Sequence, residues 1–376
     1  MKAKVVEFIT NLSDGGAENL VKDYAIMLRD RMDVTVLTIR NFTHTAVYRT
    51  LKENGVKIVS VYPRWNIAVK LFNKIFGRWY IPYKLNQLIQ NEKPDCIHAH
   101  LYILKYLKRI SGKIQGIKLL YSCHSGPSRY FGPDFPEQTD AAKYLIEHNN
   151  LQFVALHEDM RDEINAMFGV NDTVVIRNGV DFRRFENLAE TQAEIRKELG
   201  IPETAFVVGH VGRFTFQKNH EFLIEVFREV CKKSPNAVLL LVGSGDLREQ
   251  VENKLREYNL LDRTKILSNR TDVPRLMKAM DVFVFPSIIE GFGIVLVEAQ
   301  ISGLRCLISD AVPAETHLSH LAIPMELAAG PERWAEAALA AESYSDLPNR
   351  LEEYDMRREI DRLEQLYCAK NPSGAM

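Results

Sequence analysis

Residues 287–300 read SIIEGFGIVLVEAQ and join an apolar strand to an apolar helix through a glycine-rich turn. The strand before it, DVFVFP, covers residues 281–286. A buried strand, a glycine turn and a helix in this order are typical of a parallel α/β sheet. Two acids interrupt the pattern: Glu290 precedes a helix start expected near Gly293, and Glu298 falls within the first turns of that helix.

The same alternation of short β-branched runs and helical periodicity extends over the rest of the chain. The expected strands of the first half are KVVEFIT (4–10), DVTVLT (33–38), VKIVSV (56–61), DCIHAH (95–100), KLLYSC (118–123), LQFVAL (151–156) and TVVIRN (173–178). Those of the second half are AFVVGHV (205–211), AVLLLVG (237–243), TKILSN (264–269), DVFVFP and RCLISD (305–310). The expected helices include AENLVKDYAIMLRD (17–30), EFLIEVFREVCKK (221–233), DLREQVENKLREYN (246–259) and VPRLMKAM (273–280).

Continuous apolar strands separated by helices favour parallel sheets that are covered on both faces. The sequence therefore predicts an α/β protein with two tandem, Rossmann-like, doubly wound domains. We expect an N-terminal domain over residues 1–182 and a C-terminal domain over residues 183–349. The last forty or so residues are expected to be helical, with a helix at about residues 350–372 that can pack back on the first domain.

Composition limits the class of protein. The chain has 376 residues, of which 46% are hydrophobic and 26% charged, enough apolar mass for two cores. A net charge of −1 gives no overall field that would favour nucleic acid. The five cysteines form no C-x-x-C pair, which argues against a disulfide framework or structural zinc and favours a reducing cytosol. Neither a signal peptide nor a transmembrane helix is expected.

Ligands of doubly wound sheets bind beyond the carboxyl ends of the strands, so the loops that follow the strands are candidate sites. The loop NLSDGGAEN contains Gly15 and Gly16, which permit positive φ and a close backbone approach to an anion at a helix start. An ordinary tight turn is the alternative. The loop lacks the G-x-G-x-x-G fingerprint, which argues against a dehydrogenase.

Three further loops follow strands of the second half. In GHVGRFTFQKNHEF, Arg213 and Lys218 can point to one anion as a planar fork and a point charge, although both can equally be surface cations. In LVGSGDLREQ, the requirements of the fold explain Gly243 and Gly245 well enough, and ligand binding is the less favoured alternative. In SNRTDVPRLM, Asp272 or Thr271 is expected to cap a helix, and Arg270 can line a pocket.

The stretch 287–300 is the fifth loop. A helix that begins near Gly293 would direct its amides towards a diphosphate. Glu298, a turn further on, could accept hydrogen bonds from a ribose diol, whereas Glu290 on the loop would bind sugar hydroxyls or stabilise a cationic transition state. Dipole stabilisation alone can explain two acids near one helix start, but it explains five such loops less well.

Together these motifs resemble glycosyltransferase family 4, which has the GT-B fold of two Rossmann-like domains and an interdomain cleft, and within it an EpsF-like exopolysaccharide or capsule-assembly subgroup. IEGFGIVLVE matches the family's E-x7-E motif at Glu290 and Glu298, and VGRFTFQKN its diphosphate-binding Arg213 and Lys218. DGGAE matches the N-terminal glycine loop, and IRNGVDFRRF the crossing between domains. Asn219 stands where many members carry glycine.

The resemblance implies a retaining hexosyl transfer from a nucleoside-diphosphate sugar, with UDP the usual carrier, and neither a metal nor another cofactor. It implies catalytic roles for Glu290, His124, Arg213 and Lys218, and a ribose contact for Glu298. The diphosphate would be bound by Gly16, Arg213, Lys218, Phe292, Gly293 and Ile294. Gly15 and His124 would lie on the acceptor side, and Arg270 and Thr271 near the base. A structural role for His124 is the alternative.

Residues 64–90 read RWNIAVKLFNKIFGRWYIPYKLNQLIQ, with five cations, several aromatic residues and no acid. Such a segment can lie in a membrane interface, or its aromatic residues can fill a core. Our hypothesis is that the protein is cytoplasmic and binds peripherally to the anionic inner face of the cell membrane. Its acceptor there would be a saccharide linked to a lipid. The protein would then act in surface polysaccharide biosynthesis.

Three other functions fit part of the pattern. An epimerase acting on sugar nucleotides would use the same donor loops without an acceptor. A phosphorylase would need a pyridoxal lysine and a much longer chain. A catalytically silent protein that binds nucleotide sugars could act as a scaffold for partner enzymes.

Overall fold

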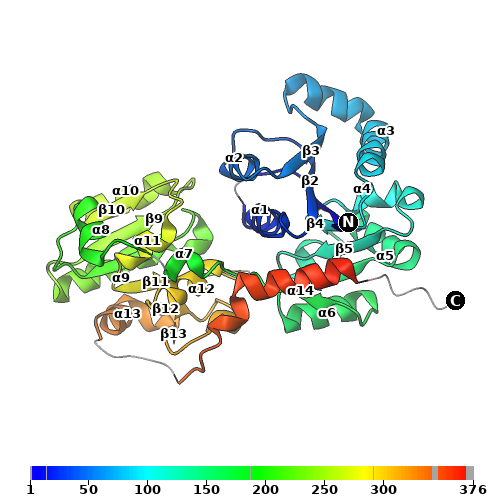
Figure 1. Ribbon diagram of the computed structural model, residues 1–376. Helices are drawn as coiled ribbons and strands as arrows, with labels where there is room; N and C mark the ends of the chain where they lie inside the picture. The colour runs from blue at the N-terminus through cyan, green and yellow to red at the C-terminus, as the bar shows by residue number, and fades with distance from the viewer. Residues whose placement is uncertain (1, 14, 187, 291, 341–345, 370–376) are drawn as a thin grey trace. The chain divides into compact units, whose positions relative to one another are not determined.

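The computed structural model describes residues 2–13, 15–186, 188–290, 292–340 and 346–369 (Figure 1). The chain forms two compact units. Unit 1 comprises Met1–Asn178 and Arg357–Met376, and unit 2 comprises Gly179–Met356. The two units are described separately below.

Unit 1 is built on one parallel sheet. In its described part, seven strands lie in the order β3-β2-β1-β4-β5-β6-β7. Their bounds are β1 Lys4–Ile9, β2 Asp33–Arg40, β3 Lys57–Tyr62, β4 Cys96–His100, β5 Lys118–Ser122, β6 Gln152–Ala155 and β7 Val174–Val175. The order reverses between β1 and β4, which is the doubly wound topology.

Helices cover both faces of this sheet (Figure 1). The helices of unit 1 are α1 Gly16–Leu28, α2 Ala46–Glu53, α3 Ile67–Glu92, α4 Leu104–Lys108, α5 Pro136–Asn149, α6 Glu158–Phe168 and α14 Met356–Cys368. Leu85 of α3 and Leu145 of α5 pack in one apolar core with Phe8 of β1. On the opposite face, Tyr24 of α1 and Tyr367 of α14 contact His98 of β4.

Unit 2 repeats the plan. Six parallel strands of its described part lie in the order β10-β9-β8-β11-β12-β13. Their bounds are β8 Val207–Val211, β9 Val238–Val242, β10 Thr264–Leu267, β11 Val282–Phe285, β12 Arg305–Ser309 and β13 Ala322–Met325. The predicted fold class, two doubly wound α/β sheets in tandem, is confirmed.

Two apolar cores flank the second sheet. The helices of unit 2 are α7 Arg183–Glu186, α8 Gln192–Glu198, α9 His220–Lys233, α10 Arg248–Glu257, α11 Val273–Lys278, α12 Ile294–Ile301 and α13 Gly330–Leu339. Side chains of α8, α11 and α12 fill the core on one face. Those of α9, α10 and α13, including the fully buried Trp334, fill the core on the other.

One strand was absent from the sequence-based prediction. β13 is an edge strand that pairs only with β12 among the described strands, and it contains Pro324 opposite Ile308. Proline cannot donate to a strand ladder, so the segment does not read as a strand from its sequence, although proline is tolerated at a sheet edge.

The last described helix belongs to unit 1. The Lys118 ammonium of β5 donates to the carbonyl of Leu366 on α14, and Arg31 forms ion pairs with Asp361 and Glu364. Tyr367 reaches the sheet itself, where its hydroxyl donates to Glu7 of β1. Because these contacts come from the far end of the chain, unit 1 is discontinuous in sequence.

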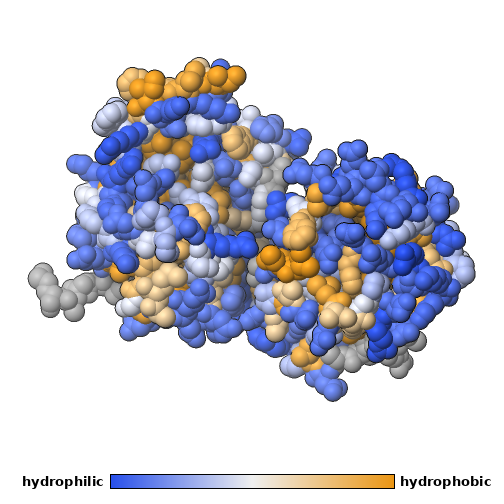
Figure 2. All heavy atoms as spheres, turned by 180° about the vertical axis from the view of Figure 1, so that it is seen from behind, coloured by the Kyte–Doolittle hydropathy of each residue, from blue (hydrophilic) through white to orange (hydrophobic). Residues whose placement is uncertain are grey.

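α3 packs against its unit over only part of its length. Gly77, Ile81, Leu85 and Ile89 are its buried residues, and all lie in its second half or near its middle. Apolar side chains at every fourth position are 61–76% exposed: Ile67, Leu71, Ile75, Trp79 and Tyr83. Figure 2 shows the resulting apolar patch at the top of the view. Among the described residues, no helix is long and apolar enough to cross a bilayer.

Candidate functional site

The strand order of unit 2 reverses where β8 and β11 lie side by side, with Val282 opposite Val208. Chains leaving these neighbouring strands turn to opposite faces of the sheet, which opens a crevice at their carboxyl ends. The loop after β8 carries Arg213 and Lys218, and the loop after β11 carries Glu290. The fold thus brings two of the predicted loops to one place.

Lys218 and Glu290 form an ion pair across these loops. The Lys218 Nζ lies 2.5 Å from the Glu290 Oε2, and the two side chains are 16% and 17% exposed. The same ammonium sits 4.3 Å from the ring centroid of Phe285, at the end of β11. A backbone hydrogen bond from Ile288 to the Gln217 carbonyl, at 2.9 Å, also joins the loops. A partly buried cation and carboxylate are therefore held in fixed positions.

The backbone conformation of Asn219 explains how asparagine can stand where many family members carry glycine. Asn219 has φ 51° and ψ 49°, in the left-handed region, and is the N-cap of α9. Glycine adopts this conformation most readily, and asparagine is among the few other residues that tolerate it. The loop backbone can therefore keep its turn without glycine.

Arg213 lies at the start of the same loop and is exposed. Its guanidinium has no ion pair with any residue in the described ranges, whereas Lys218 is paired with Glu290. The two predicted anion ligands thus differ in their surroundings. Arg213 is available for an incoming anion, and Lys218 must first exchange its carboxylate partner.

α12 begins as the sequence predicts. Gly293 is its N-cap with φ 73°, and a Cβ at this position would lie 3.2 Å from the Glu290 Cγ. The first amides of a helix have no partner within the helix, and they attract anions. Phe292 is nearly buried and stacks on Tyr354, which anchors the start of the helix. Gly291, the first glycine of the turn, lies outside the described residues.

Glu298 sits in the second turn of α12 with its side chain 16% exposed. One of its carboxylate oxygens lies 3.8 Å from the Arg184 guanidinium of α7. This cation partly balances the acid, a contact that the sequence did not predict. A hydroxyl-bearing ligand at Glu298 would therefore also lie close to Arg184.

Arg270 and Thr271 lie after the edge strand β10, two strands away from β8. The Arg270 guanidinium donates to both carboxylate oxygens of Asp272, at 2.7 and 2.5 Å. Asp272 occupies the N-cap position of α11, but its side chain caps no backbone amide. The prediction that Asp272 or Thr271 stands at the helix start as its cap is therefore confirmed in position for Asp272, but the Asp272 carboxylate binds the Arg270 guanidinium and no helix amide.

Gly243 and Gly245 serve the packing of two loops. A Cβ on Gly243 would lie 1.9 Å from the Gly212 carbonyl oxygen, and one on Gly245 would lie 2.5 Å from that of Phe214. The loop after β9 is thus pressed against the loop that carries Arg213. This close approach requires glycine at both positions, as expected from the fold.

In unit 1, the glycine loop after β1 differs from expectation. Gly15 is the N-cap of α1 with φ −93°, so the positive φ that glycine permits is not used there. A Cβ on Gly15 would instead lie 2.3 Å from the Oε2 of Glu18, whose other carboxylate oxygen, Oε1, accepts a hydrogen bond from the Ser13 hydroxyl at 2.5 Å. The carboxylate of Glu18 therefore lies beside the N-terminus of α1. Asp14 of the motif lies outside the described residues, and the role of Gly16 stays a prediction.

His124 follows β5 and is half-buried. Its Nε2 lies 2.9 Å from the Nδ1 of His100, whose Nε2 lies 2.8 Å from the Glu7 Oε2. These residues belong to three neighbouring strands or their ends, in the order β1-β4-β5. The predicted histidine therefore ends a hydrogen-bonded chain that begins at a fully buried acid.

A side branch completes this cluster. The Tyr367 hydroxyl lies 2.5 Å from the Glu7 Oε1 and 2.6 Å from the His98 Nδ1, and the His98 Nε2 lies 2.8 Å from the Ser122 hydroxyl. Burial raises the pKa of Glu7 and lowers the pKa of His98 and of His124, and it lowers the pKa of His100 to about 3. The histidines are therefore neutral at physiological pH.

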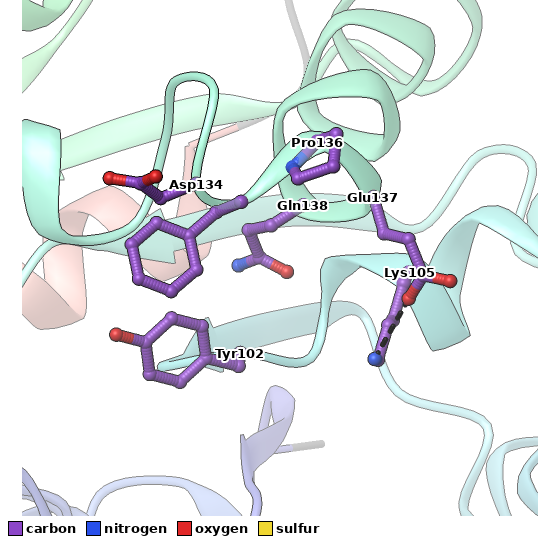
Figure 3. Close-up of a pocket in the computed structure, with 7 residues that line it drawn as sticks. Tyr102, Lys105, Asp134, Pro136, Glu137 and Gln138 are labelled. Atoms are coloured by element: carbon purple, nitrogen blue, oxygen red, sulfur yellow. Dashed lines mark hydrogen bonds and ion pairs between the residues drawn. The ribbon is translucent and has the colours of Figure 1, made fainter.

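A small pocket opens beside the end of β4. Figure 3 shows Tyr102 on one side and the start of α5, with Pro136 and Gln138, on the other. The ring centroids of Tyr102 and Phe135 are 5.3 Å apart, and Lys105 pairs with Glu137 at 2.9 Å. Aromatic surface next to a few fixed polar groups is typical of small-molecule sites.

Sequence reasoning missed this pocket and the residues behind His124. A signal existed for the latter: Glu7 interrupts an apolar strand, and His98 and His100 alternate in another, so both strands carry buried polar groups. The register that sets Glu7 opposite His98 could not be read from the sequence.

Two family models match the chain. Residues 14–184 match Glycosyltransferase Family 4, and residues 191–357 match Glycosyl transferases group 1. The chain is 27% identical over 318 residues to EpsF of Bacillus subtilis (strain 168), named as a glycosyltransferase, with 82% of this chain and 79% of EpsF covered. It is 28% identical to the UDP-Gal:alpha-D-GlcNAc-diphosphoundecaprenol alpha-1,3-galactosyltransferase of Escherichia coli, with 60% of each chain covered.

Solved structures share the fold over nearly the whole chain. HepE from Anabaena, in complex with UDP and glucose, superposes with a TM-score of 0.74 at 20% identity, covering 97% of this chain and 99% of HepE. WaaG, a glycosyltransferase involved in lipopolysaccharide biosynthesis, superposes with a TM-score of 0.67 at 15% identity, covering 97% and 100%. At these identities the likeness establishes the fold.

Proposed function

The chain belongs to glycosyltransferase family 4, a retaining family with the GT-B fold. On that premise we propose that it transfers the sugar of a UDP-sugar donor to a lipid-linked saccharide. The acceptor and the base of the donor are parts of this proposal. The pathway we propose is the assembly of a surface polysaccharide.

The Lys218–Glu290 pair beside the start of α12 is the observation that carries the proposal. It places a cation, a carboxylate and a helix N-terminus at the carboxyl ends of neighbouring strands, where doubly wound sheets bind ligands. A diphosphate needs positive charge and amide donors, and a sugar needs a carboxylate for its hydroxyls. The UDP in HepE and the UDP-Gal named for the Escherichia coli relative support UDP as the carrier.

Within this site, the diphosphate would contact Arg213, Lys218 and the amides of Phe292, Gly293 and Ile294. Glu290 would orient the sugar hydroxyls, and Glu298 would accept hydrogen bonds from the ribose. Arg270 and Thr271 are assigned to the base. In unit 1, Gly15 and His124 are assigned to the acceptor side, and Gly16 to the diphosphate.

The reaction we propose proceeds on one face of the sugar. The acceptor hydroxyl attacks from the side that the diphosphate leaves, and a departing phosphate oxygen takes the hydroxyl proton. Arg213, Lys218 and the helix amides stabilise the negative charge that develops, and Glu290 stabilises the oxocarbenium-like carbon. We propose that these groups neutralise the leaving diphosphate without a metal ion.

The exposed stripe of α3 supports a lipid-linked acceptor. Arg64, Lys70, Lys74, Arg78 and Lys84 accompany the stripe, and no acid occurs between residues 64 and 90. A helix that presents large apolar side chains with cations around them binds an anionic bilayer surface. We therefore propose peripheral attachment to the inner face of the cell membrane. The diphosphoundecaprenol acceptor named for the Escherichia coli relative agrees with this arrangement.

The pocket at Tyr102 is our proposed saccharide subsite. Its aromatic rings offer a flat apolar surface, and Lys105, Glu137 and Gln138 offer hydrogen bonds to hydroxyls. The pocket follows β4, next to the strand that leads to His124.

A donor screen followed by a transfer assay tests the function. The nucleotide sugar that raises the melting temperature most is then incubated with saccharides carried on undecaprenyl diphosphate, on a short soluble lipid, or free. We expect transfer to the lipid-linked acceptor with an α-configured product from an α-configured donor. Conversion of the donor to another sugar without an acceptor would identify an epimerase, and binding without any turnover would identify a scaffold. Either outcome would refute the proposal.

A further inference from the structure

We propose that Glu7, His100 and His124 form a hydrogen-bond relay in which the protonation state of Glu7 decides whether the Nδ1 of His124 accepts or donates a hydrogen bond. The inference deepens the role assigned to His124, and so it rests on the proposed function for its meaning. Its geometry and its test do not depend on activity.

Two consecutive hydrogen bonds link Glu7 to His124 through His100. Glu7 Oε2 lies 2.8 Å from His100 Nε2, and His100 Nδ1 lies 2.9 Å from His124 Nε2. His100 thus uses opposite ring nitrogens towards Glu7 and His124, so that its tautomer links the two bonds. His124 Nδ1 is the remaining nitrogen, and no residue in the described part of the chain is hydrogen bonded to it.

With Glu7 ionised, only one set of proton positions satisfies the chain. The carboxylate can only accept, so His100 must carry its proton on Nε2. The bare His100 Nδ1 must then accept from the Nε2–H of His124. The Nδ1 of His124 is left with a lone pair, and it can accept a hydrogen bond from a hydroxyl.

With Glu7 protonated, every step reverses. The carboxylic acid donates from Oε2 to His100 Nε2, and His100 carries its proton on Nδ1. That proton is donated to the Nε2 of His124, and the proton of His124 moves to Nδ1. One proton at a buried acid thus converts the far nitrogen from an acceptor into a donor, and neither state contains an imidazolium.

The side branch is the same in both states. Tyr367 donates to the Glu7 Oε1, accepts from the His98 Nδ1–H, and Ser122 donates to the His98 Nε2. These bonds hold Glu7 in place through its Oε1. The His98 Nδ1 also lies 3.5 Å from the Oε2 that faces His100, a distance too long for a well-formed hydrogen bond. Tyr367 is therefore a positioning residue, as are Glu7 and His100.

Burial favours this scheme over one with charged histidines. It raises the pKa of Glu7 and lowers the pKa of His100 to about 3, so that the proton resides on the acid in preference to the imidazoles. The titratable groups that face the relay come from several elements: Tyr24 of α1, Cys96 and His98 of β4, Tyr130 near His124, and Tyr367 and Glu359 of α14.

The test observes the tautomer directly. Protein with 15N-labelled histidine is titrated from about pH 5 to about pH 9, and long-range proton–nitrogen spectra report which ring nitrogen of His124 carries the proton. In the wild type we expect the proton to move from Nδ1 to Nε2 as the pH rises, at a pH above the usual carboxyl range. In Glu7→Gln, whose amide can donate to His100 but cannot ionise, His124 should keep its proton on Nδ1 throughout.

Two other variants complete the experiment. Ser122→Ala removes a bond of the side branch alone and should leave the switch of His124 unchanged. Tyr367→Phe removes a donor from the ionised carboxylate and should move the switch about one unit to higher pH, which provides a readout if Glu7→Gln does not fold. A His124 tautomer that is the same in wild type and Glu7→Gln at all pH values, or that Ser122→Ala alters as strongly, would overturn the relay.

An activity measurement then connects the relay to the reaction. If His124 acts on a sugar hydroxyl, the pH profile of kcat/KM should contain an inflection at the pH of the tautomer switch, and Glu7→Gln should abolish that inflection. A tautomer switch without the inflection would retain the relay and remove His124 from the reaction. The two proposals can therefore fail separately.

Discussion

The ammonium of Lys218 lies 2.5 Å from the carboxylate of Glu290, although the two residues are 72 positions apart in the chain. The adjacency of β8 and β11 produces this contact. The cation is thus already neutralised by an acid of the same unit. A diphosphate that binds Lys218 must displace this acid, which would leave Glu290 available for a sugar.

The first prediction concerns Glu290→Gln. Removing the negative charge frees Lys218 for the diphosphate and also removes a repulsive carboxylate, so UDP should bind roughly tenfold more tightly by calorimetry. Turnover should nevertheless fall by about 100-fold, because the sugar loses its orienting carboxylate. Lys218→Met should weaken UDP binding. Weaker UDP binding in Glu290→Gln would contradict the exchange of partners.

The second prediction concerns Arg213→Ala. The side chain is exposed and has no ion pair among the described residues, so the free energy of unfolding should change by less than about 0.5 kcal/mol. The turnover number should fall by about 100-fold or more if the guanidinium stabilises the leaving diphosphate. Lys197→Ala, which removes an exposed cation of α8 in the same unit, is the matched control. It should change neither the free energy of unfolding nor the turnover number. Near-normal turnover of Arg213→Ala would refute the assignment.

The third prediction compares two glycines at the two ends of α12. Gly293 and Gly303 have φ of 73° and 77°, and alanine at either position should cost about 1 kcal/mol of unfolding free energy. A Cβ on Gly303 meets no atom within 4 Å, whereas one on Gly293 crowds Glu290. Only Gly293→Ala should therefore lower kcat. Equal kcat values in the two variants would argue that Glu290 needs no fixed position.

The fourth prediction concerns the exposed stripe of α3. Vesicle flotation should recover the wild type with anionic vesicles at low salt, and less of it with zwitterionic vesicles or at high salt. Ile75→Ser combined with Trp79→Ser should lower the bound fraction roughly tenfold without loss of stability, since both side chains are exposed. Phe216→Ser removes an exposed aromatic ring of unit 2 and serves as the control. Wild-type protein that ignores anionic vesicles would refute membrane attachment.

The fifth prediction concerns stability in acid. Burial lowers the pKa of His220 from 6.5 to about 4, so the unfolded chain binds a proton between these pH values and the folded chain does not. Stability is therefore lost as the pH falls from about 6.5 to about 4, by about 3 kcal/mol for this group. Urea denaturation of His220→Phe should show a correspondingly smaller loss. His148→Phe, on an exposed part of α5, should behave as the wild type.

The sequence allowed prediction of the fold because each strand is a short apolar run, and apolar runs between helices imply parallel sheets. β13 was missed because Pro324 hides an edge strand. The loops of the candidate site could be predicted from the same strands, because the loops that follow parallel strands all lie at one edge of the sheet. What the sequence could not provide was register and pairing: that Lys218 meets Glu290, that Arg184 approaches Glu298, or that Glu7 lies opposite His98.

The glycine loop shows a second limit. Gly15 looks like a position chosen for its φ, yet its backbone is extended and the space is taken by Glu18. Glycine is needed at position 15 because a Cβ there would clash with the side chain of Glu18, three residues away. Side-chain packing of this kind leaves no periodic trace in a sequence.

The position of Tyr367 on α14 has a consequence for how the protein is made. Its hydroxyl completes the hydrogen bonding of Glu7, which lies on β1, 360 positions earlier in the chain. Domains generally fold during synthesis from the N-terminus onward, but α14 is made only after the whole of unit 2. A nascent chain stalled before α14 should therefore hold the sheet of unit 1 with a buried acid still lacking its partner, and chaperones could bind it until α14 is made.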